Sequence, residues 1–263
     1  MILAVDAHNL IWRAFHALKS VGCRRKLIVA NVLSMIDTCL DVIDAEHGVV
    51  AFDSVCRSRV EIFPGYKAAN ETRRAEEDPK LRDERLAATE RLKDVIFPAC
   101  GFQTILYPGC EADDIIASIA AQNSTRRVTI LSSDEDLWQC VREGEVSTIK
   151  IKDGGKFSQG MTEKLLKQEY GLTPRLWPMV LAAAGGHDGI PGVPGIGKKT
   201  AVAWVQGNAS DRINAKMMDH RMEFRKYLKL VKLPLEGTPK FNVHYTPINR
   251  GAMLELIRKY RNG

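Results

Sequence analysis

The chain has 263 residues, enough for one large or two moderate domains with a hydrophobic core. Apolar residues make up 45% and charged residues 27%, as in an ordinary globular protein, and no apolar run approaches the length of a membrane span. The six cysteines show no paired CxxC spacing, which argues against a zinc site and against a disulfide framework. We therefore expect a cytoplasmic protein with reduced core thiols and no membrane association.

The net charge of +6 hides an asymmetry along the chain. Residues 198–263 carry 14 Lys and Arg against 5 Asp and Glu, whereas residues 1–197 carry 24 against 27. A slightly acidic portion followed by a basic portion suggests chemistry in the first and binding to a polyanion in the second. Lys-rich helices are also common on solvated surfaces, so this asymmetry alone is weak evidence for nucleic acid.

Short apolar runs alternate with helical patterns through the first 160 residues. Strands are expected at 2–5, 49–52, 101–106, 128–131 and 146–151, and the last one forms an edge hairpin with 156–157 through the turn 153–155. Helices are expected from about Leu10 and over about Leu27–Ile43. This alternation predicts a mainly parallel βαβ sheet with flanking helices. From Met161 the chain looks all-helical, with helix starts at Thr162 and Thr173.

Acidic residues recur at the ends of these predicted strands. They are Asp6, Asp53, the trio Glu111, Asp113 and Asp114, and the pair Asp134 and Asp136. Ligand sites in open α/β sheets lie at the carboxyl ends of the strands. Acidic residues also cap helix starts, so the trio on its own is more typical of an ordinary helix N-terminus. The recurrence favours a divalent cation, because clustered carboxylates repel one another.

A highly charged segment follows the sequence Phe63–Lys67 and extends to about Asp94. Pro79 divides it, and an apolar stripe predicts a helix in its second half. Two interpretations stay open for this segment. It is either a solvated pair of surface helices or a mobile helical lid that carries basic residues toward a substrate, namely Lys67, Arg73, Arg74 and Arg82.

Residues 185–201 are rich in Gly and Pro. They do not form a phosphate loop of an NTPase, because Lys199 follows Lys198 where Ser or Thr is required and no strand precedes them. Two Gly/Pro turns followed by a helix near Lys198 resemble a helix-hairpin-helix instead. Backbone N–H groups, the helix dipole and lysines hold a DNA phosphate in such an element without reading sequence. A purely structural loop is the alternative.

Taken together, these motifs resemble the 5′-nuclease (flap endonuclease) family, in particular the 5′→3′ exonuclease domain of bacterial DNA polymerase I and its stand-alone bacterial and phage relatives. The resemblance is carried by Val5-Asp6, Phe52-Asp53, Tyr66-Lys67, Gly109 to Asp114, Ser133 to Leu137 with Gln139, and Asp188 to Ala201. These motifs cover most of residues 1–205 in the family's order. Beyond about Val205 no motif is seen.

The resemblance implies an α/β fold in two domains. Residues 1–160 are expected to form a PIN-like catalytic domain with a mainly parallel twisted sheet and a helical arch at about 65–97. Residues 161–263 are expected to form an all-helical helix-three-turn-helix (helix-hairpin-helix) DNA-binding domain with its hairpin at 189–200. The implied activity is that of a monomeric, metal-dependent, structure-selective 5′ nuclease in replication or repair. Its expected substrates are flap, nicked or 5′-ended duplex DNA and RNA-primed hybrids.

The resemblance also implies roles for individual residues. The first metal cluster is matched by Asp6, Asp53, Glu111 and Asp113, and the second by Asp114, Asp134, Asp136 and Asp188. The residues expected to act directly in catalysis are Lys67, Asp113 and Asp114. The residues expected to bind DNA are Tyr66, Lys67, Arg73, Arg74, Gly192, Gly195, Gly197, Lys198, Lys199 and Thr200. Hard oxygen ligands suit two Mg²⁺ ions, for which Mn²⁺ can substitute, and K⁺ is a further candidate at the hairpin.

Two positions depart from the family pattern. Gly185 stands where the family often has Asp, three residues before Asp188, and Asn70 stands where it often has Arg, three residues after Lys67. These departures leave open a junction-binding DNA protein that cleaves poorly. Among enzymes, a PIN-type ribonuclease is the other alternative. The Gly/Pro hairpin and the basic C-terminal portion speak against the ribonuclease. The histidines near the motifs are expected to be structural or on the surface: His8, His16 and His187.

Overall fold

The computed structural model describes residues 1–19, 24–68, 72, 76–123, 125–151, 157–186 and 188–262. Several positions discussed above lie outside these ranges: Cys23, Asn70, Arg73, Arg74, the turn 153–155 with Lys156, and His187. The other five cysteines are buried and free, as expected for reduced core thiols. Within the described ranges, no helix is long and apolar enough to cross a membrane.

A six-stranded sheet with the order β3-β2-β1-β4-β5-β6 forms the centre of the molecule. Its strands are β1 (Ile2–Asp6), β2 (His47–Phe52), β3 (Phe102–Leu106), β4 (Val128–Leu131), β5 (Val146–Ile151) and β6 (Phe157–Gln159). The first five are parallel, and β6 pairs antiparallel with β5 at the edge. The expected α/β fold with a mainly parallel sheet is therefore confirmed.

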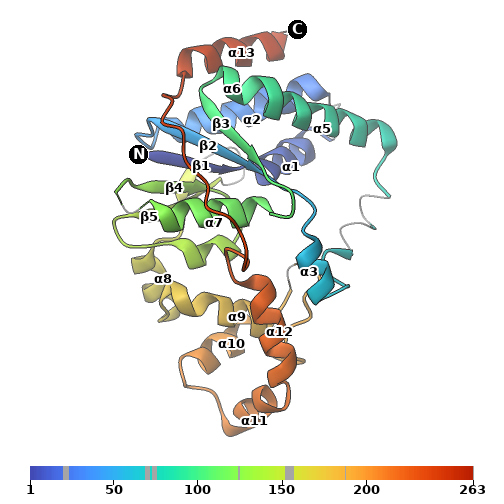
Figure 1. Cartoon of the computed structure of the whole chain (residues 1–263), viewed down its shortest axis with the longest axis vertical. Helices are drawn as coiled ribbons and strands as arrows, with labels where there is room; N and C mark the ends of the chain where they lie inside the picture. Colours follow the sequence, from blue (N-terminus) through green and yellow to red (C-terminus); the bar gives the residue numbers. More distant parts are fainter. Residues whose placement is uncertain are drawn as a thin grey trace.

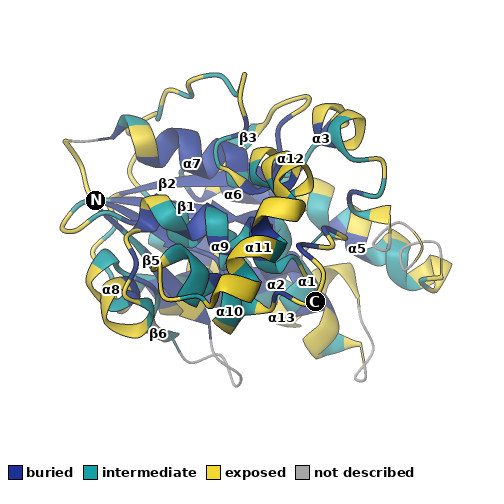
Figure 2. Cartoon of the chain, turned by 90° about the horizontal axis from the view of Figure 1, so that it is seen from below, coloured by how far each residue is buried: buried dark blue, intermediate teal, exposed yellow. Residues whose placement is uncertain are grey.

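Helices cover both faces of this sheet (Figure 1). The elements before β4 are α1 (Ala7–Leu18), α2 (Arg25–Leu40), α3 (Arg57–Ile62), α5 (Pro79–Arg91), the π-helical turn η1 (Leu92–Ile96), α6 (Phe97–Ala99) and α7 (Ala112–Gln122). Side chains of β1 alternate between two cores, because successive residues of a strand point to opposite faces. Leu3 and Val5 pack with α1, α2 and α5, whereas Ile2 and Ala4 pack with α7. In Figure 2 the central strands are dark blue between these two layers.

A smaller helical unit follows the sheet and has its own core. Its elements are the 3-10 turn η4 (Pro174–Leu176) and the helices α8 (Glu163–Tyr170), α9 (Trp177–Ala184), α10 (Lys198–Val205), α11 (Asp211–Asp219) and α12 (Arg221–Val231). The 3-10 turn η2 (Asp136–Cys140) lies between β4 and β5 and packs Trp138 against this core. Thr162 caps α8 through its hydroxyl, as expected. Thr173 and Pro174 open η4, which leads directly into α9. Figure 1 shows this unit below the sheet.

The C-terminal segment does not stay with the helical unit. Phe241 and Val243 pack on the α7 side of the sheet, and Pro247 bridges His47 at the start of β2. Helix α13 (Arg250–Asn262) then packs on α2, with Met253 fully buried in the core of the sheet layer (Figure 1). The expected second domain over 161–263 is therefore corrected: it ends near α12, and the remainder completes the first layer.

The charged segment after Lys67 is the part of the chain in which an arch is expected. Helix α5 begins at Pro79 with Asp78 as its cap, and Ala88 lies in the core together with Leu92 and Ile96 of η1. The part from Pro79 onward thus packs on the core, and Arg82 near its start lines a cavity together with Lys67, Asp53 and Glu111. The arch at about 65–97 stays a prediction.

We predict that Met253→Ala lowers the free energy of unfolding by about 2–5 kcal/mol, because it removes a fully buried side chain from the core. Leu254→Ala is the matched control, since Leu254 is 37% exposed one residue away. Equilibrium unfolding in urea measures both. Equal small effects would show that α13 is not integrated with the sheet layer.

Candidate active site

Carboxylates gather at the carboxyl edge of the sheet because three adjacent parallel strands end there. Asp6 ends β1, Asp53 follows β2, and Asp134 follows β4, which pairs with β1 on its other side. Helix α7 adds Glu111 as its N-cap and Asp113 in its first turn. The convergence expected from the strand ends is therefore realised by topology.

Asp6 is held in place by two neighbouring donors. The backbone N–H of Asn9 donates to its Oδ1 at 3.0 Å, and the Ser132 hydroxyl donates to its Oδ2 at 3.0 Å. Burial raises the pKa of Asp6 to about 7, and the charges of Asp53 and Asp134 contribute to this rise. The side chain is therefore ordered among like charges.

The carboxyl groups of Asp113 and Asp136 are also buried near other negative charges. Burial and the charge of Asp134 raise the pKa values of both Asp113 and Asp136 well above the ordinary range. Asp136 Oδ1 is also buried without a hydrogen-bond partner in the structure. A buried oxygen without a partner is uncommon and requires an explanation such as an ion. A hard divalent cation fits this donor set of carboxylate oxygens.

These side chains are not yet arranged as a closed metal site. Among the described residues, no group of three or more His, Cys, Asp or Glu could hold a metal ion as it stands. Other contacts orient several of the carboxylates. Asp53 Oδ1 accepts from Ala112 N–H at 2.9 Å, and Asp134 Oδ1 accepts from Asp136 N–H at 2.9 Å. The backbone therefore brings these acidic residues to one edge of the sheet, while their side chains form hydrogen bonds with other groups.

Lys67 lies between two acids from different parts of the chain. Its Nζ donates to Glu111 Oε1 at 2.8 Å and lies 3.6 Å from Asp188 Oδ2. The Tyr66 hydroxyl donates to Glu111 Oε2 at 2.8 Å, and this hydroxyl oxygen also lies 3.1 Å from Asp188 Oδ2. Burial alone would lower the pKa of Lys67, but the two acids raise it above its ordinary value. The lysine is therefore a fixed cation at the carboxylate cluster.

Lys67 and Asp188 both adopt left-handed backbone conformations, with φ of 55° and 52°. Such values are uncommon for residues other than glycine. Lys67 N–H donates to the Asp188 carbonyl at 2.7 Å. Gly189 permits this approach, because a Cβ there would lie 2.8 Å from the Gly65 carbonyl oxygen. The turn at Lys67 and the start of the hairpin thus form one interlocked unit.

Asp114 differs from its neighbours in α7. It is fully buried, and Arg59 donates to both of its carboxylate oxygens, at 2.5 Å to Oδ2 and 2.8 Å to Oδ1. The backbone N–H groups of Leu235 and Glu111 donate to it as well. The expectation that Asp114 is a catalytic metal ligand is therefore corrected, because its oxygens are already engaged by a buried cation and the backbone.

Arg59 is a residue that sequence reasoning missed. It lies on α3, which has no counterpart among the expected elements, and its side chain is 2% exposed. It also bonds Glu111 Oε2 at 3.2 Å and the Leu230 carbonyl at 3.1 Å. No local pattern separates it from the surface arginines around it. His8 was expected to be structural, and its ring accepts from Asp53 N–H at 3.2 Å.

The Gly/Pro hairpin connects α9 to α10 through a close crossing of two backbone segments. A Cβ on Gly185 would lie 2.4 Å from Gly192 N, and both glycines have positive φ. Val193 N–H donates to the Ala183 carbonyl at 2.8 Å across this crossing. Gly185 is therefore required by the turn, and a carboxylate side chain does not fit there.

The two lysines at the start of α10 have different surroundings. Lys198 pairs with Glu135, and its Nζ lies 5.1, 5.4 and 5.2 Å from three ring centroids, those of Trp138, Tyr170 and Trp177. Lys199 is exposed. The expectation that both lysines bind DNA changes accordingly, because Lys198 is engaged within the fold. Gly197, the N-cap of α10, is exposed, and Thr200 in the first turn of α10 is half-buried.

K⁺ is a candidate at the hairpin, where the Pro194 carbonyl already has a neighbouring cation. Lys216 Nζ donates to the Pro194 carbonyl at 3.0 Å and lies next to Gly195. An ammonium group thus compensates this carbonyl in the structure, and K⁺ at the hairpin stays a prediction.

The sheet, its acidic edge and the attached hairpin define a resolvase-like α/β protein. The model of the family described as the 5′-3′ exonuclease N-terminal resolvase-like domain matches residues 1–171, and the chain belongs to this family. The chain is 31% identical over 213 residues to DNA polymerase I of Mycobacterium tuberculosis, and 34% identical over 206 residues to the thermostable DNA polymerase I of Thermus aquaticus. The matches cover 78% and 76% of this chain, but it spans only 22% and 23% of those relatives.

Solved structures agree with this fold over the whole chain. The T5 5′-exonuclease with bound zinc has a TM-score of 0.74 and 17% identity, covering 99% of this chain and 98% of that one. The catalytic core of Rad2 in complex with DNA substrate has a TM-score of 0.59 and 14% identity, covering 98% and 86%. Human GEN1 in complex with Holliday junction DNA has a TM-score of 0.59 and 16% identity, covering 100% and 68%.

We predict that Arg59→Ala destabilises the protein by about 3–5 kcal/mol, because it leaves the buried Asp114 charge without its partner. Arg57→Ala on the same helix is the control, since Arg57 is exposed. Urea unfolding at neutral pH compares the two. A loss for Arg59→Ala no larger than that for Arg57→Ala would contradict the buried ion pair.

Proposed function

We propose that this chain is a metal-dependent, structure-selective 5′ nuclease that hydrolyses phosphodiester bonds in flap, nicked or 5′-ended DNA. One observation carries the proposal: a cluster of carboxylates with raised pKa values, one with a buried oxygen lacking a partner, adjoins Glu111, which binds the cation Lys67. Membership of the 5′-3′ exonuclease family supports it. Replication or repair is the setting in which such substrates arise, including RNA-primed hybrids.

The proposed ligand set is the sequence-based set without Asp114. One cluster consists of Asp6, Asp53, Glu111 and Asp113, and the other of Asp134, Asp136 and Asp188. Two Mg²⁺ ions would supply an activated water and stabilise the attacking and leaving oxygens, and Mn²⁺ has the same ligand preference. Glu111 and Asp188 now contact Lys67. Side-chain rotations about a fixed backbone are therefore needed to complete the ligand set.

Lys67 is proposed to act on the scissile phosphate. The backbone turn at Lys67, fixed by its N–H bond to the Asp188 carbonyl, keeps the ammonium group at the carboxylate cluster when the side chains of Glu111 and Asp188 rotate toward metal ions. A cation fixed in advance stabilises charge that develops in the transition state more than charge in the ground state. Tyr66 positions this lysine indirectly, since its ring lies 5.3 Å from Lys67 Nζ and its hydroxyl bonds Glu111.

The hairpin is proposed to hold duplex DNA through its backbone. Gly192, Gly195 and Gly197 keep side chains away from the turn, and Lys199 and Thr200 lie at the start of α10. Backbone N–H groups at such a helix start bind phosphate without reading sequence.

We predict that the protein cleaves a 5′-labelled DNA flap only with Mg²⁺ or Mn²⁺, and that Asp113→Asn lowers the rate at least about a thousand-fold. The loss of one ligand removes several kcal/mol of charge stabilisation. Asp94→Asn is the control, because Asp94 is exposed on η1. DNA binding in EDTA should persist or tighten in Asp113→Asn, since it removes negative charge.

Each alternative has its own result in this assay. Tight junction binding with no divalent-dependent cleavage would identify a DNA-binding protein that cleaves poorly. Cleavage of single-stranded RNA but not of DNA would identify a ribonuclease. Near-wild-type turnover by Asp113→Asn would sink the metal assignment.

We predict that Lys199→Ala lowers the log–log salt slope of duplex binding by about 0.9, the value for one lost phosphate contact. Lys198→Ala should instead lower the thermal midpoint, because Lys198 contacts Glu135 and three aromatic rings. Fluorescence anisotropy in EDTA at several salt concentrations, together with thermal unfolding, measures both. The reverse assignment of the two effects would show that Lys198 turns outward to DNA.

A further inference from the structure

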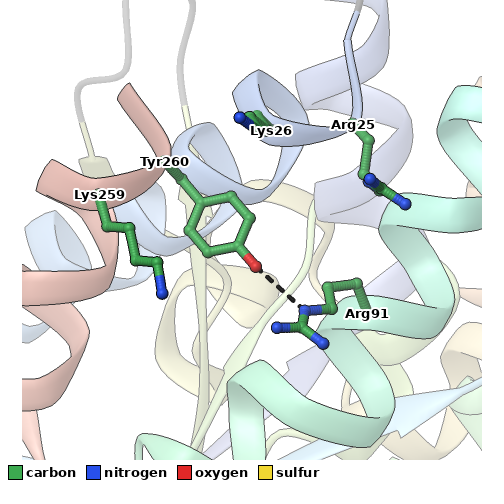
Figure 3. A pocket seen from close by; sticks show the side chains of 5 residues that line it. All are labelled: Arg25, Lys26, Arg91, Lys259 and Tyr260. Atoms are coloured by element: carbon green, nitrogen blue, oxygen red, sulfur yellow. Dashed lines mark hydrogen bonds between the residues drawn. The ribbon is translucent and has the colours of Figure 1, made fainter. Parts of the chain in front are cut away.

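A basic cavity lies away from the carboxylate cluster, between three helices of the layer above the sheet. Its volume is about 340 Å³. Figure 3 shows the side chains that line it: Arg25, Lys26, Arg91, Lys259 and Tyr260. Four of these five side chains are cationic, and none is acidic.

The cavity is built by segments that are far apart in sequence. Helix α13 packs on α2, and Arg250 at its start bonds Asp37 near the end of α2 at 2.6 Å. The two helices are therefore antiparallel, so that the end of α13 with Lys259 lies beside the start of α2 with Arg25. Arg91 at the end of α5 closes the third side. The fold thus brings four positive charges together.

Tyr260 gives the cavity an ordered centre. Its hydroxyl oxygen accepts a hydrogen bond from Arg91 Nε at 3.0 Å, drawn as the dashed line in Figure 3. This bond orients the guanidinium and leaves the hydroxyl proton for another acceptor. Glu84 on α5 contributes an acid nearby, and its carboxylate accepts from the backbone N–H of Arg25. Four cationic side chains around one cavity create a positive potential that attracts an anion.

We propose that this cavity binds phosphoryl groups, with the backbone of a DNA substrate as their source. Guanidinium forks match phosphate oxygens, and lysines add point charges, so the lining suits phosphate rather than a neutral ligand. The choice of DNA rests on the proposed nuclease function.

Position favours DNA over a free nucleotide. Helices α1 and α2 form the crossover between the parallel strands β1 and β2, and α2 ends shortly before β2 begins, so the end of α2 lies toward the amino edge of the sheet and the start of α2 toward the opposite edge. The first residue of α2, Arg25, therefore lies toward the carboxyl edge of the sheet, where the carboxylates gather. A strand held at that edge can extend over the cavity.

The test compares two double variants that remove the same charge. Arg91→Gln with Lys259→Gln alters the cavity, whereas Lys164→Gln with Lys167→Gln alters exposed positions on α8. Binding of nicked duplex DNA is measured in EDTA by anisotropy across a salt series. The cavity pair should lower the log–log salt slope by about 0.9 to 1.8, for one or two lost phosphate contacts, and the α8 pair should not.

A second arm measures the binding of inorganic tripolyphosphate, a small phosphoryl probe, to the protein and its variants by calorimetry. Loss of its binding together with the reduced DNA slope supports the cavity as a DNA contact. Loss of its binding with a DNA slope equal to that of the α8 pair assigns the cavity to a free phosphorylated ligand and overturns the DNA source. No loss in either arm overturns the proposal altogether.

Controls distinguish a loss of phosphoryl binding from a loss of folding and from a failure of the proposed nuclease function. The four substituted positions are exposed, and a thermal midpoint within the range of the α8 pair verifies folding. Tyr260→Phe keeps the ring and removes only the hydroxyl, so it should weaken tripolyphosphate about threefold. Neither arm needs cleavage. Failure of the nuclease assay therefore leaves the phosphoryl result intact, and failure of the cavity leaves the nuclease assay intact.

Discussion

The buried ion pair between Arg59 and Asp114 is the contact on which the site depends. Two charges inside a protein are tolerated only when they satisfy each other, and this pair also engages the backbone at Leu230 and Leu235. It thereby joins α3, the start of α7 and the end of α12. The position of Glu111, one turn away and bonded to the same guanidinium, follows from this pair. The acidic edge of the sheet and the helical unit are therefore fixed to each other through one desolvated cation.

Environment divides residues that look equivalent in the sequence. Asp113 and Asp114 are adjacent acids at the start of α7, yet one is surrounded by other carboxylates and the other by a guanidinium. Lys198 and Lys199 differ in the same way, since an aromatic cage and Glu135 engage only the first. A side chain that the fold has already paired is less available for metal or DNA, because that partner must first be displaced.

The sequence predicts the parts of the site that arise from strand order and local pattern. Apolar runs that end in Asp6 and Asp53 locate buried parallel strands, and the parallel arrangement brings these acids together without further information. What could not be predicted depends on partners far along the chain. Arg59 lies more than fifty residues from Asp114, and nothing near Met253 indicates that its helix returns to the sheet. Gly185 looks like a missing acid in the sequence. The reason for the glycine is visible only in the fold, where a Cβ at this position would clash with the backbone of Gly192.

The hydrogen bond from Lys67 to the Asp188 carbonyl makes the hairpin and the base of the charged segment mechanically continuous. Both residues have left-handed backbones, and Gly65 and Gly189 pack against each other, so the junction has little room to adjust by small rotations. A displacement of the hairpin is therefore transmitted to the backbone of Lys67 and so to its ammonium group. Under the proposed function, binding of the duplex and alignment of Lys67 at the carboxylate cluster are then one event, so that the shape of the substrate governs the reaction.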